Sequence, residues 1–189
     1  MQHVSIVLTR SNHWYGKVIR WITKSNVNHA FISYYSKQWG GEWAVDVAER
    51  GVVKIPLELA LKNCEYKEVY YLNNVDLGTA MPKFRNYIGV NYDWWGIVGF
   101  FFKILTWRLF GRKFCNLIQR KDRHFCSESV VIFMQNAENA PSWILELDPS
   151  TVAPGGTCEF LGVPSLQQVL QKHVVTDEVV WEKSFHKSQ

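Results

Sequence analysis

The sequence lacks the cysteine patterns of proteins held together by disulfides or zinc. Its cysteines are few and widely spaced, with no CxxC pair among Cys64, Cys115, Cys126 and Cys158. This spacing argues against a structural zinc site. The N-terminus also lacks a charged start followed by the apolar core of roughly 7–15 residues that defines a signal peptide. We therefore expect reduced thiols, in a protein of the cytoplasm or in one exported without a signal.

Strong basic charge and long apolar runs are missing as well. The net charge is only +4, and no run of Lys and Arg resembles a nucleic-acid-binding arm, so we expect no nucleic-acid partner. The most hydrophobic stretch, residues 94–110, has 17 residues including Lys103 and Arg108, whereas a membrane span needs roughly 20 apolar residues. We interpret this stretch as a buried helix or hairpin-like cover, with membrane or lipid contact as the alternative.

Hydrophobic and aromatic side chains are abundant. Hydrophobic residues make up 47% of the chain and aromatic residues 15%, with nine tryptophans. This composition excludes disorder and indicates a packed domain whose aromatic residues line a groove or an interface. Because the chain has 189 residues and neither a repeat nor a linker, we expect a single domain over residues 1–189.

Hydrophobic periodicity predicts an α+β fold. Strands are expected at residues 3–9, 29–35, 42–48, 51–55, 66–72 and 174–181. Helices are expected at residues 13–24, 56–62, 76–88 and 164–172, and the first of them carries an apolar face made of Trp14, Val18, Trp21 and Ile22. A turn at residues 39–41 joins two of the strands into an antiparallel hairpin. We expect a small, mostly antiparallel sheet or half-barrel packed against a further helix, described next.

The stretch 123–134 begins polar, places Cys126 next and then becomes apolar at helical spacing. Phe125, Val130, Phe133 and Met134 fit the buried face of a helix. Cys126 would then lie on the first turn, where unpaired backbone N–H groups and the positive end of the helix dipole favour an anion. A thiol at this position is shifted toward the reactive thiolate.

A thiolate nucleophile needs a base, and the base needs a third polar group that orients it. His29 lies at the start of one hairpin strand, and Asp46 is a carboxylate within the otherwise apolar second strand. If the hairpin is antiparallel, Asp46 can reach one imidazole nitrogen while the other nitrogen faces Cys126. The residues therefore suggest a Cys126, His29 and Asp46 triad.

Three nearby residues offer alternative assignments. His124 is a competing base, although neighbours at a helix start point in different directions. Glu49 is a second candidate for the role of Asp46. Glu128 fits a favourable interaction with the helix N-terminus better than a part in the chemistry.

Four segments resemble the permuted papain-like cysteine hydrolases of the YiiX/YycO type, a branch of the NlpC-like superfamily. They are residues 11–32 (SNHWYGKVIRWITKSNVNHAFI), 45–52 (VDVAERGV), 89–96 (GVNYDWWG) and 125–130 (FCSESV). The last is similar to the family's nucleophile motif, with Ser129 in place of leucine. All four occur in the family's order, and together they span about residues 5 to 150.

The resemblance implies a circularly permuted papain-like fold and a thiol hydrolase that needs no metal or cofactor. Cys126 would be the nucleophile, His29 the general base and Asp46 the orienting residue, although the third residue is often Glu in this branch. Tyr92 would lie beside the nucleophile and help to bind an oxyanion with the Cys126 backbone N–H. Ser127 and Trp94 complete the set of residues predicted to bind oxyanion or substrate.

The substrate implied by the resemblance is an amide, first of all in the peptides of peptidoglycan. A bacteriophage origin would fit a wall hydrolase without a signal peptide, in which case the protein would be associated with the virion and contact virion assembly partners. A lipid acyl hydrolase or acyltransferase is the alternative enzyme. A virion component or lipid-binding protein that keeps the fold without turnover is the alternative from a different class.

Overall fold

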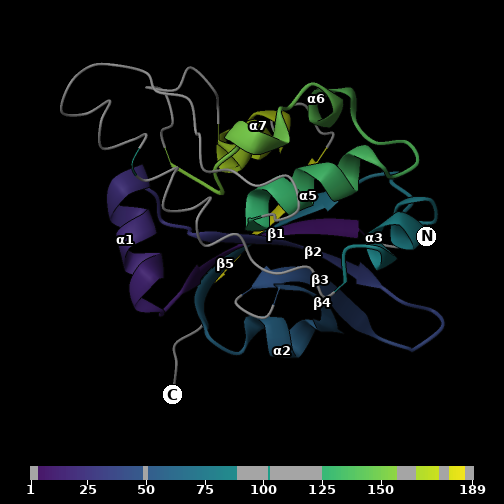
Figure 1. Ribbon diagram of the computed structural model, residues 1–189, viewed down its shortest axis with the longest axis horizontal. Coiled ribbons are helices and arrows are strands. Elements are labelled where there is room, and N and C mark those ends of the chain that lie inside the picture. Colours follow the sequence, from purple (N-terminus) through teal and green to yellow (C-terminus); the bar gives the residue numbers. More distant parts are fainter. Residues whose placement is uncertain are drawn as a thin grey trace.

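The fold is an antiparallel sheet with helices on both faces (Figure 1), seen in a computed structural model that describes residues 4–48, 51–88, 102, 125–156, 165–174 and 179–185. The sheet has six strands in the order β4-β3-β2-β1-β5-β6, and every neighbouring pair is antiparallel. The strands are β1 (Val4–Ser11), β2 (His29–Tyr35), β3 (Glu42–Ala48), β4 (Gly51–Pro56), β5 (Cys64–Leu72) and β6 (Val179–Phe185). The α+β class and the hairpin of β2 and β3 are as the sequence predicts.

The helices form two unequal layers. One face of the sheet carries α5 (Cys126–Gln135), accompanied by α6 (Ser142–Leu145), α7 (Leu166–Val174) and the short 3-10 helix η1 (Pro149–Thr151). The opposite face carries α2 (Leu57–Leu61), and α3 (Ala80–Arg85) follows β5. Figure 1 shows α5, α6 and α7 on one side of the strands and α2 on the other, with α1 (Trp14–Thr23) at the end of the sheet.

Side-chain alternation along the strands creates two apolar cores. Ile6, Ile32 and Tyr70 are register partners whose side chains join Val130 and Met134 of α5 in the larger core. The residues one position away face the other way, and a smaller core of Val7, Phe31, Ala44 and Val69 packs against α2. Because successive strand residues point to opposite faces, central strands that are apolar at consecutive positions supply side chains to both cores.

The first helix forms as predicted, but the part of its apolar face that the structure describes is not in the core. Val18 is 39% exposed and Trp21 is 71% exposed. The helix lies at the end of the sheet rather than across a face (Figure 1). Its close contact with the sheet is made by Gly16, where a Cβ atom would lie 2.6 Å from Nδ2 of Asn28. The periodicity was therefore right about the helix, and of the two face residues whose burial is described neither is in the core.

Two other predicted elements differ in their bounds. The helix expected at residues 76–88 is confined to Ala80–Arg85, because Asp76 instead forms a two-way backbone bridge with Glu138. The last strand begins at Val179, later than expected, since Val174 still belongs to α7. The hydrophobic stretch 94–110 lies outside the described residues except for Phe102, and the described helices are all too short or too polar to cross a bilayer.

Candidate active site

The candidate site lies where two neighbouring strands separate. The β2–β3 ladder runs from Tyr35↔Glu42 to Ile32↔Val45 and stops there. Beyond that point β2 remains paired with β1, and β3 remains paired with β4. The two strands therefore part at the end that carries His29 and Asp46, and polar side chains can occupy the space without breaking a ladder hydrogen bond.

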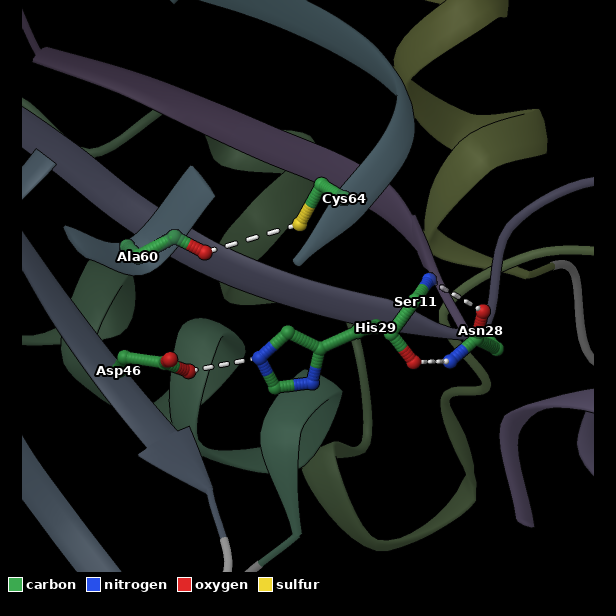
Figure 2. A network of polar contacts seen from close by, with 6 residues as sticks. All are labelled: Ser11, Asn28, His29, Asp46, Ala60 and Cys64. Atoms are coloured by element: carbon green, nitrogen blue, oxygen red, sulfur yellow. Dashed lines mark hydrogen bonds and ion pairs between the residues drawn. The ribbon is translucent and has the colours of Figure 1, made fainter. Parts of the chain in front are cut away.

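His29 and Asp46 are joined across this opening. The Nε2 atom of His29 lies 2.7 Å from Oδ1 of Asp46, and Figure 2 shows the ring and the carboxylate pointing toward each other. An ionised carboxylate can only accept, so the shared hydrogen is the one on Nε2. The His29 side chain is 19% exposed and that of Asp46 is 9% exposed. The contact is therefore partly shielded from water, and Nδ1 is left for another partner.

The backbone in front of His29 is held by a buried polar network. The Asn28 side chain accepts from the backbone N–H of Ser11 at 3.0 Å and from Arg20 at 2.9 Å, and it donates to the Ser11 hydroxyl at 2.7 Å. Figure 2 shows the two contacts between Asn28 and Ser11 beside the imidazole. Because Asn28 is also tied to Thr9 through its backbone, the start of β2 has a defined position relative to β1.

Cys126 is the first residue of α5, as the sequence predicts. The Glu128 carboxylate accepts a hydrogen bond from the backbone N–H of Phe125 at 3.3 Å, which anchors the helix start and agrees with the capping role expected for Glu128. Cys126 is 5% exposed and forms no disulfide. Since α5 packs against β2, its N-terminus reaches the opening that holds the His29 ring.

The electrostatics of His29 connect the three residues. Burial alone would lower the pKa of His29, but the negative charges of Asp46 and of a Cys126 thiolate, together with the hydrogen bonds that the ring donates to both side chains, raise this pKa well above its ordinary 6.5. An imidazolium is thus favoured between the carboxylate and the sulfur. This arrangement is able to hold a thiolate and to give a proton to a group that departs from it.

Sequence reasoning missed a second cysteine near this pair. Cys64 begins β5, and its sulfur lies 3.6 Å from the backbone oxygen of Ala60 on the same side of the sheet as the imidazole (Figure 2). Burial raises the pKa of the Cys64 thiol, and this outweighs the lowering effects of the Thr9 hydroxyl and of His29. Cys64 is therefore held as a neutral thiol. Its position near His29 follows from the pairing of β5 with β1, which no local sequence motif predicts.

The other residues predicted for the site are either hydrogen-bonded elsewhere or outside the described residues. The Ser127 hydroxyl donates to the backbone oxygen of Val152 at 2.7 Å, and the residue is 0% exposed, so this side chain is directed into the core and its hydroxyl is already bonded. Tyr92 and Trp94, predicted to bind oxyanion or substrate, lie outside the described residues. The same is true of the alternative base His124 and the alternative carboxylate Glu49.

Comparisons with known proteins identify the fold. No family model and no curated protein matches the chain. A solved structure does: the crystal structure of metalloprotein yiiX from Escherichia coli O157:H7 (DUF1105), with a TM-score of 0.54 and 15% sequence identity, over 99% of this chain and 98% of that one. The predicted YiiX-like fold is confirmed by this likeness, which at such low identity concerns the fold alone.

The word metalloprotein raises the question of a metal site in this chain. Protein-bound metals are held by clusters of His, Cys, Asp or Glu side chains. Within the described residues there is no group of three or more such side chains arranged to hold an ion.

Proposed function

We propose that this protein is a cysteine-nucleophile hydrolase that cleaves an amide bond. The observation that carries the proposal is the 2.7 Å contact between His29 and Asp46 at the N-terminus of the Cys126 helix. A nucleophile, an adjacent base and a third group that orients the base form the arrangement that covalent acyl transfer requires.

The reaction would proceed in two steps. The Cys126 thiolate attacks the carbonyl carbon of the amide, and the oxyanion that forms is stabilised by backbone N–H groups at the start of α5. The imidazolium of His29 gives its Nδ1 proton to the departing amine as the C–N bond breaks, which leaves a thioester on Cys126. His29 then takes a proton from water, the hydroxide attacks the thioester, and the carboxylic acid is released with return of the thiolate.

Asp46 would act on the reaction through His29. Its bond to Nε2 directs Nδ1 toward the sulfur, and its charge favours the imidazolium. The peptides of peptidoglycan remain the first amide to test, as the sequence resemblance suggests, and a phage or virion setting is part of the same proposal.

Selective alkylation tests the nucleophile without knowledge of the substrate. At about pH 6, iodoacetamide should modify Cys126 well before Cys64, because the imidazolium favours a thiolate at the first position while burial keeps the second thiol neutral. Peptide mapping by mass spectrometry gives the rate at each cysteine. The selectivity should disappear in His29→Gln and persist in His173→Gln, whose ring stacks on Trp143 away from the site. Equal labelling of the folded protein at Cys126 and Cys64 would end the proposal.

Turnover is tested by incubating the protein with soluble wall peptides and following the products by mass spectrometry. A new free amine and a new carboxyl group should appear together, and a thioester of the intact protein should accumulate at early times. Both signals should be absent in Cys126→Ala. A product that forms equally in Cys126→Ala would show that another group or a contaminant is responsible.

A further inference from the structure

A buried loop segment contacts both the helix that carries Cys126 and the turn that leads to His29. It comprises residues 152–156 (VAPGG), follows η1 and has no regular secondary structure. Val152 and Ala153 are almost completely buried. Irregular segments normally lie at the surface, because their backbone groups find partners there in water. The burial of the 152–156 segment therefore indicates that specific contacts hold it in place.

One of these contacts fixes the start of α5. The hydroxyl of Ser127, which follows Cys126 directly, donates to the backbone oxygen of Val152 at 2.7 Å. Because Ser127 is fully buried, loss of this bond would leave the Val152 oxygen without its donor in a place that is shielded from water. The bond therefore holds the first turn of α5, and with it Cys126, at a set position relative to the segment.

The segment also lies directly on the turn that leads into β2. A Cβ atom at Gly155 would lie 2.4 Å from Oγ of Ser25 and 2.4 Å from Cγ2 of Val27, so only glycine allows so close an approach. Val27 is almost completely buried, and it precedes His29 by two residues. The Ser25 hydroxyl accepts from the backbone N–H of Val27 at 3.0 Å. The contact at Gly155 thus touches the turn whose end positions the imidazole.

The segment is itself anchored to the sheet through α7. The backbone N–H of Gln167 donates to the oxygen of Pro154 at 3.2 Å, and the Gln167 side chain donates to the Glu68 carboxylate of β5 at 3.0 Å. This buried carboxylate also accepts from the Tyr70 hydroxyl at 2.6 Å. The anchor involves neither of the two catalytic side chains, so the segment is a common reference point for both.

The separation of the sulfur from the imidazole needs such a reference. Among the described residues, no backbone hydrogen bond joins α5 to β2, so side-chain packing and the 152–156 segment set the distance between these elements. The required precision is high, since a displacement of about 1 Å between reacting groups can cost roughly 100-fold in rate.

We propose that the 152–156 segment sets the position of Cys126 relative to His29, and that Ser127 and Gly155 are positioning residues for the pair of thiolate and imidazolium. The inference rests on the proposed hydrolase function, because both residues act on the reaction through the two catalytic side chains. Ser127 connects the segment to the nucleophile, and Gly155 connects it to the base.

The test is the ratio of the Cys126 alkylation rates at about pH 6 and about pH 9.5, measured with iodoacetamide and mass spectrometry. A change in access of the reagent alters both rates alike and cancels in this ratio. A thiol with the ordinary pKa of about 8.5 is only about 0.3% ionised at pH 6, so its ratio is a few thousandths. A thiolate held by an imidazolium should give a ratio at least roughly tenfold higher.

Gly155→Ala pushes the segment away from Val27, and its rate ratio should fall roughly tenfold or more. Ser127→Ala removes the bond to Val152, and its ratio should fall roughly threefold to tenfold. Circular dichroism and urea unfolding show whether each variant is folded. Ser127→Ala adds no atom to the core, so it keeps the test decisive should Gly155→Ala not fold.

Two matched controls carry the same exchanges away from the segment. Gly78→Ala lies in the turn before α3, where a Cβ atom would be 3.3 Å from Oδ1 of Asp76. Ser142→Ala changes an exposed residue of α6. Both variants should keep the rate ratio of the unchanged protein, and a fall in the controls equal to that in Ser127→Ala would contradict the proposal.

The double variant Ser127→Ala with Gly155→Ala tests whether the two residues act through one linkage. Their contacts connect Cys126 to His29 in series, so the loss of either one releases the sulfur from its reference. The rate ratio of the double variant should therefore equal that of the more affected single variant. Two single effects that multiply would contradict the linkage.

The same measurements separate this inference from the hydrolase proposal. A ratio of a few thousandths in the unchanged protein would refute the activated thiol, and the positioning role would fall with it. A high ratio in the unchanged protein that persists in Ser127→Ala and Gly155→Ala would refute the positioning role and leave the hydrolase in place. A high ratio that falls in these two variants and in neither control would support both.

Discussion

Asp46→Asn is the most informative single change, because it removes a charge and preserves a shape. The Asn side-chain oxygen can still accept the hydrogen bond that Nε2 of His29 now makes to Asp46 at 2.7 Å. The ring should therefore keep its orientation, and Nδ1 should still face the sulfur. What disappears is the negative charge that raises the pKa of His29.

The size of the effect follows from the kind of hydrogen bond that is lost. A hydrogen bond to a charged group contributes about 1.5–3 kcal/mol and a neutral one about 0.5–1.5 kcal/mol. The difference of about 1–1.5 kcal/mol corresponds to roughly a tenfold change in an equilibrium or a rate. We expect Asp46→Asn to slow alkylation of Cys126 roughly tenfold near pH 6 and to lower the free energy of unfolding by about 1 kcal/mol.

The ratio of the Cys126 labelling rate in the unchanged protein to that in Asp46→Asn should depend on pH, and this dependence distinguishes an electrostatic effect from misfolding. A lower pKa of His29 in the variant leaves less imidazolium beside the sulfur at neutral pH, so the variant should be slow there. At a pH above the raised pKa of His29 the imidazole is neutral in both proteins, so this electrostatic difference disappears and the two rates should converge. Iodoacetamide labelling from about pH 5 to 9.5, followed by mass spectrometry, measures both limbs.

Asp148→Asn is the matched control, since Asp148 is an exposed carboxylate whose hydrogen bonds within the described residues are to its own turn. It should change neither the labelling rate nor its pH dependence. If the labelling rates of the unchanged protein and of Asp46→Asn had the same ratio at every pH, the electrostatic reasoning would be refuted. A stronger effect of Glu49→Gln than of Asp46→Asn would give the orienting role to Glu49.

Two further predictions concern stability. The folded protein retains a proton on His29 that the unfolded chain releases above about pH 6.5, so the contribution of His29 is complete below that pH and is lost as the pH rises through the raised folded pKa. In Cys126→Ala no thiol can exchange a proton with the imidazole, and the free energy of unfolding from urea titrations should fall from about pH 6.5 upward by at most about 1.4 kcal/mol per pH unit for this proton. The fall should be less steep when Asp46→Asn is added, and a rise over this range would contradict the assignment. Gly156→Ala should destabilise the protein by more than about 2 kcal/mol, because φ is +90° and a Cβ would lie 2.0 Å from the Thr23 backbone oxygen. Gly40→Ala, with φ of +60° and open space around it, should lose only about 1 kcal/mol, and equal losses for the two variants would contradict the clash.

Local patterns in the sequence were enough to place the elements that carry the site. Short apolar runs between turn residues predicted β2 and β3 with their observed bounds, because strands buried on both faces are apolar at most consecutive positions. The start of α5 at Cys126 was predicted for a similar reason. A change from polar to helically spaced apolar residues, with an acidic residue in the first turn, is a local signal of a helix N-terminus.

The contacts within the site depended on information that the sequence does not carry. The meeting of His29 with Asp46 requires β2 and β3 to separate beyond Ile32↔Val45, and ladder length is decided by the twist and packing of the whole sheet. The nearness of Cys64 depends on the pairing of β5 with β1, whose register shifts between Arg10 and Ser11. Such pairings join residues far apart in the chain, and single-sequence patterns give no register for them.

Which faces of the helices are buried was also decided by the tertiary structure and not by the sequence pattern. Periodicity predicts that a segment has an apolar face, but it does not say what covers that face. For α1 the tertiary structure leaves Val18 and Trp21 exposed and presses Gly16 against Asn28 instead. For α5 it buries Val130 and Met134 in the core. The sequence by itself thus determined the elements and the candidate chemistry, and only packing between distant segments decided which surfaces meet.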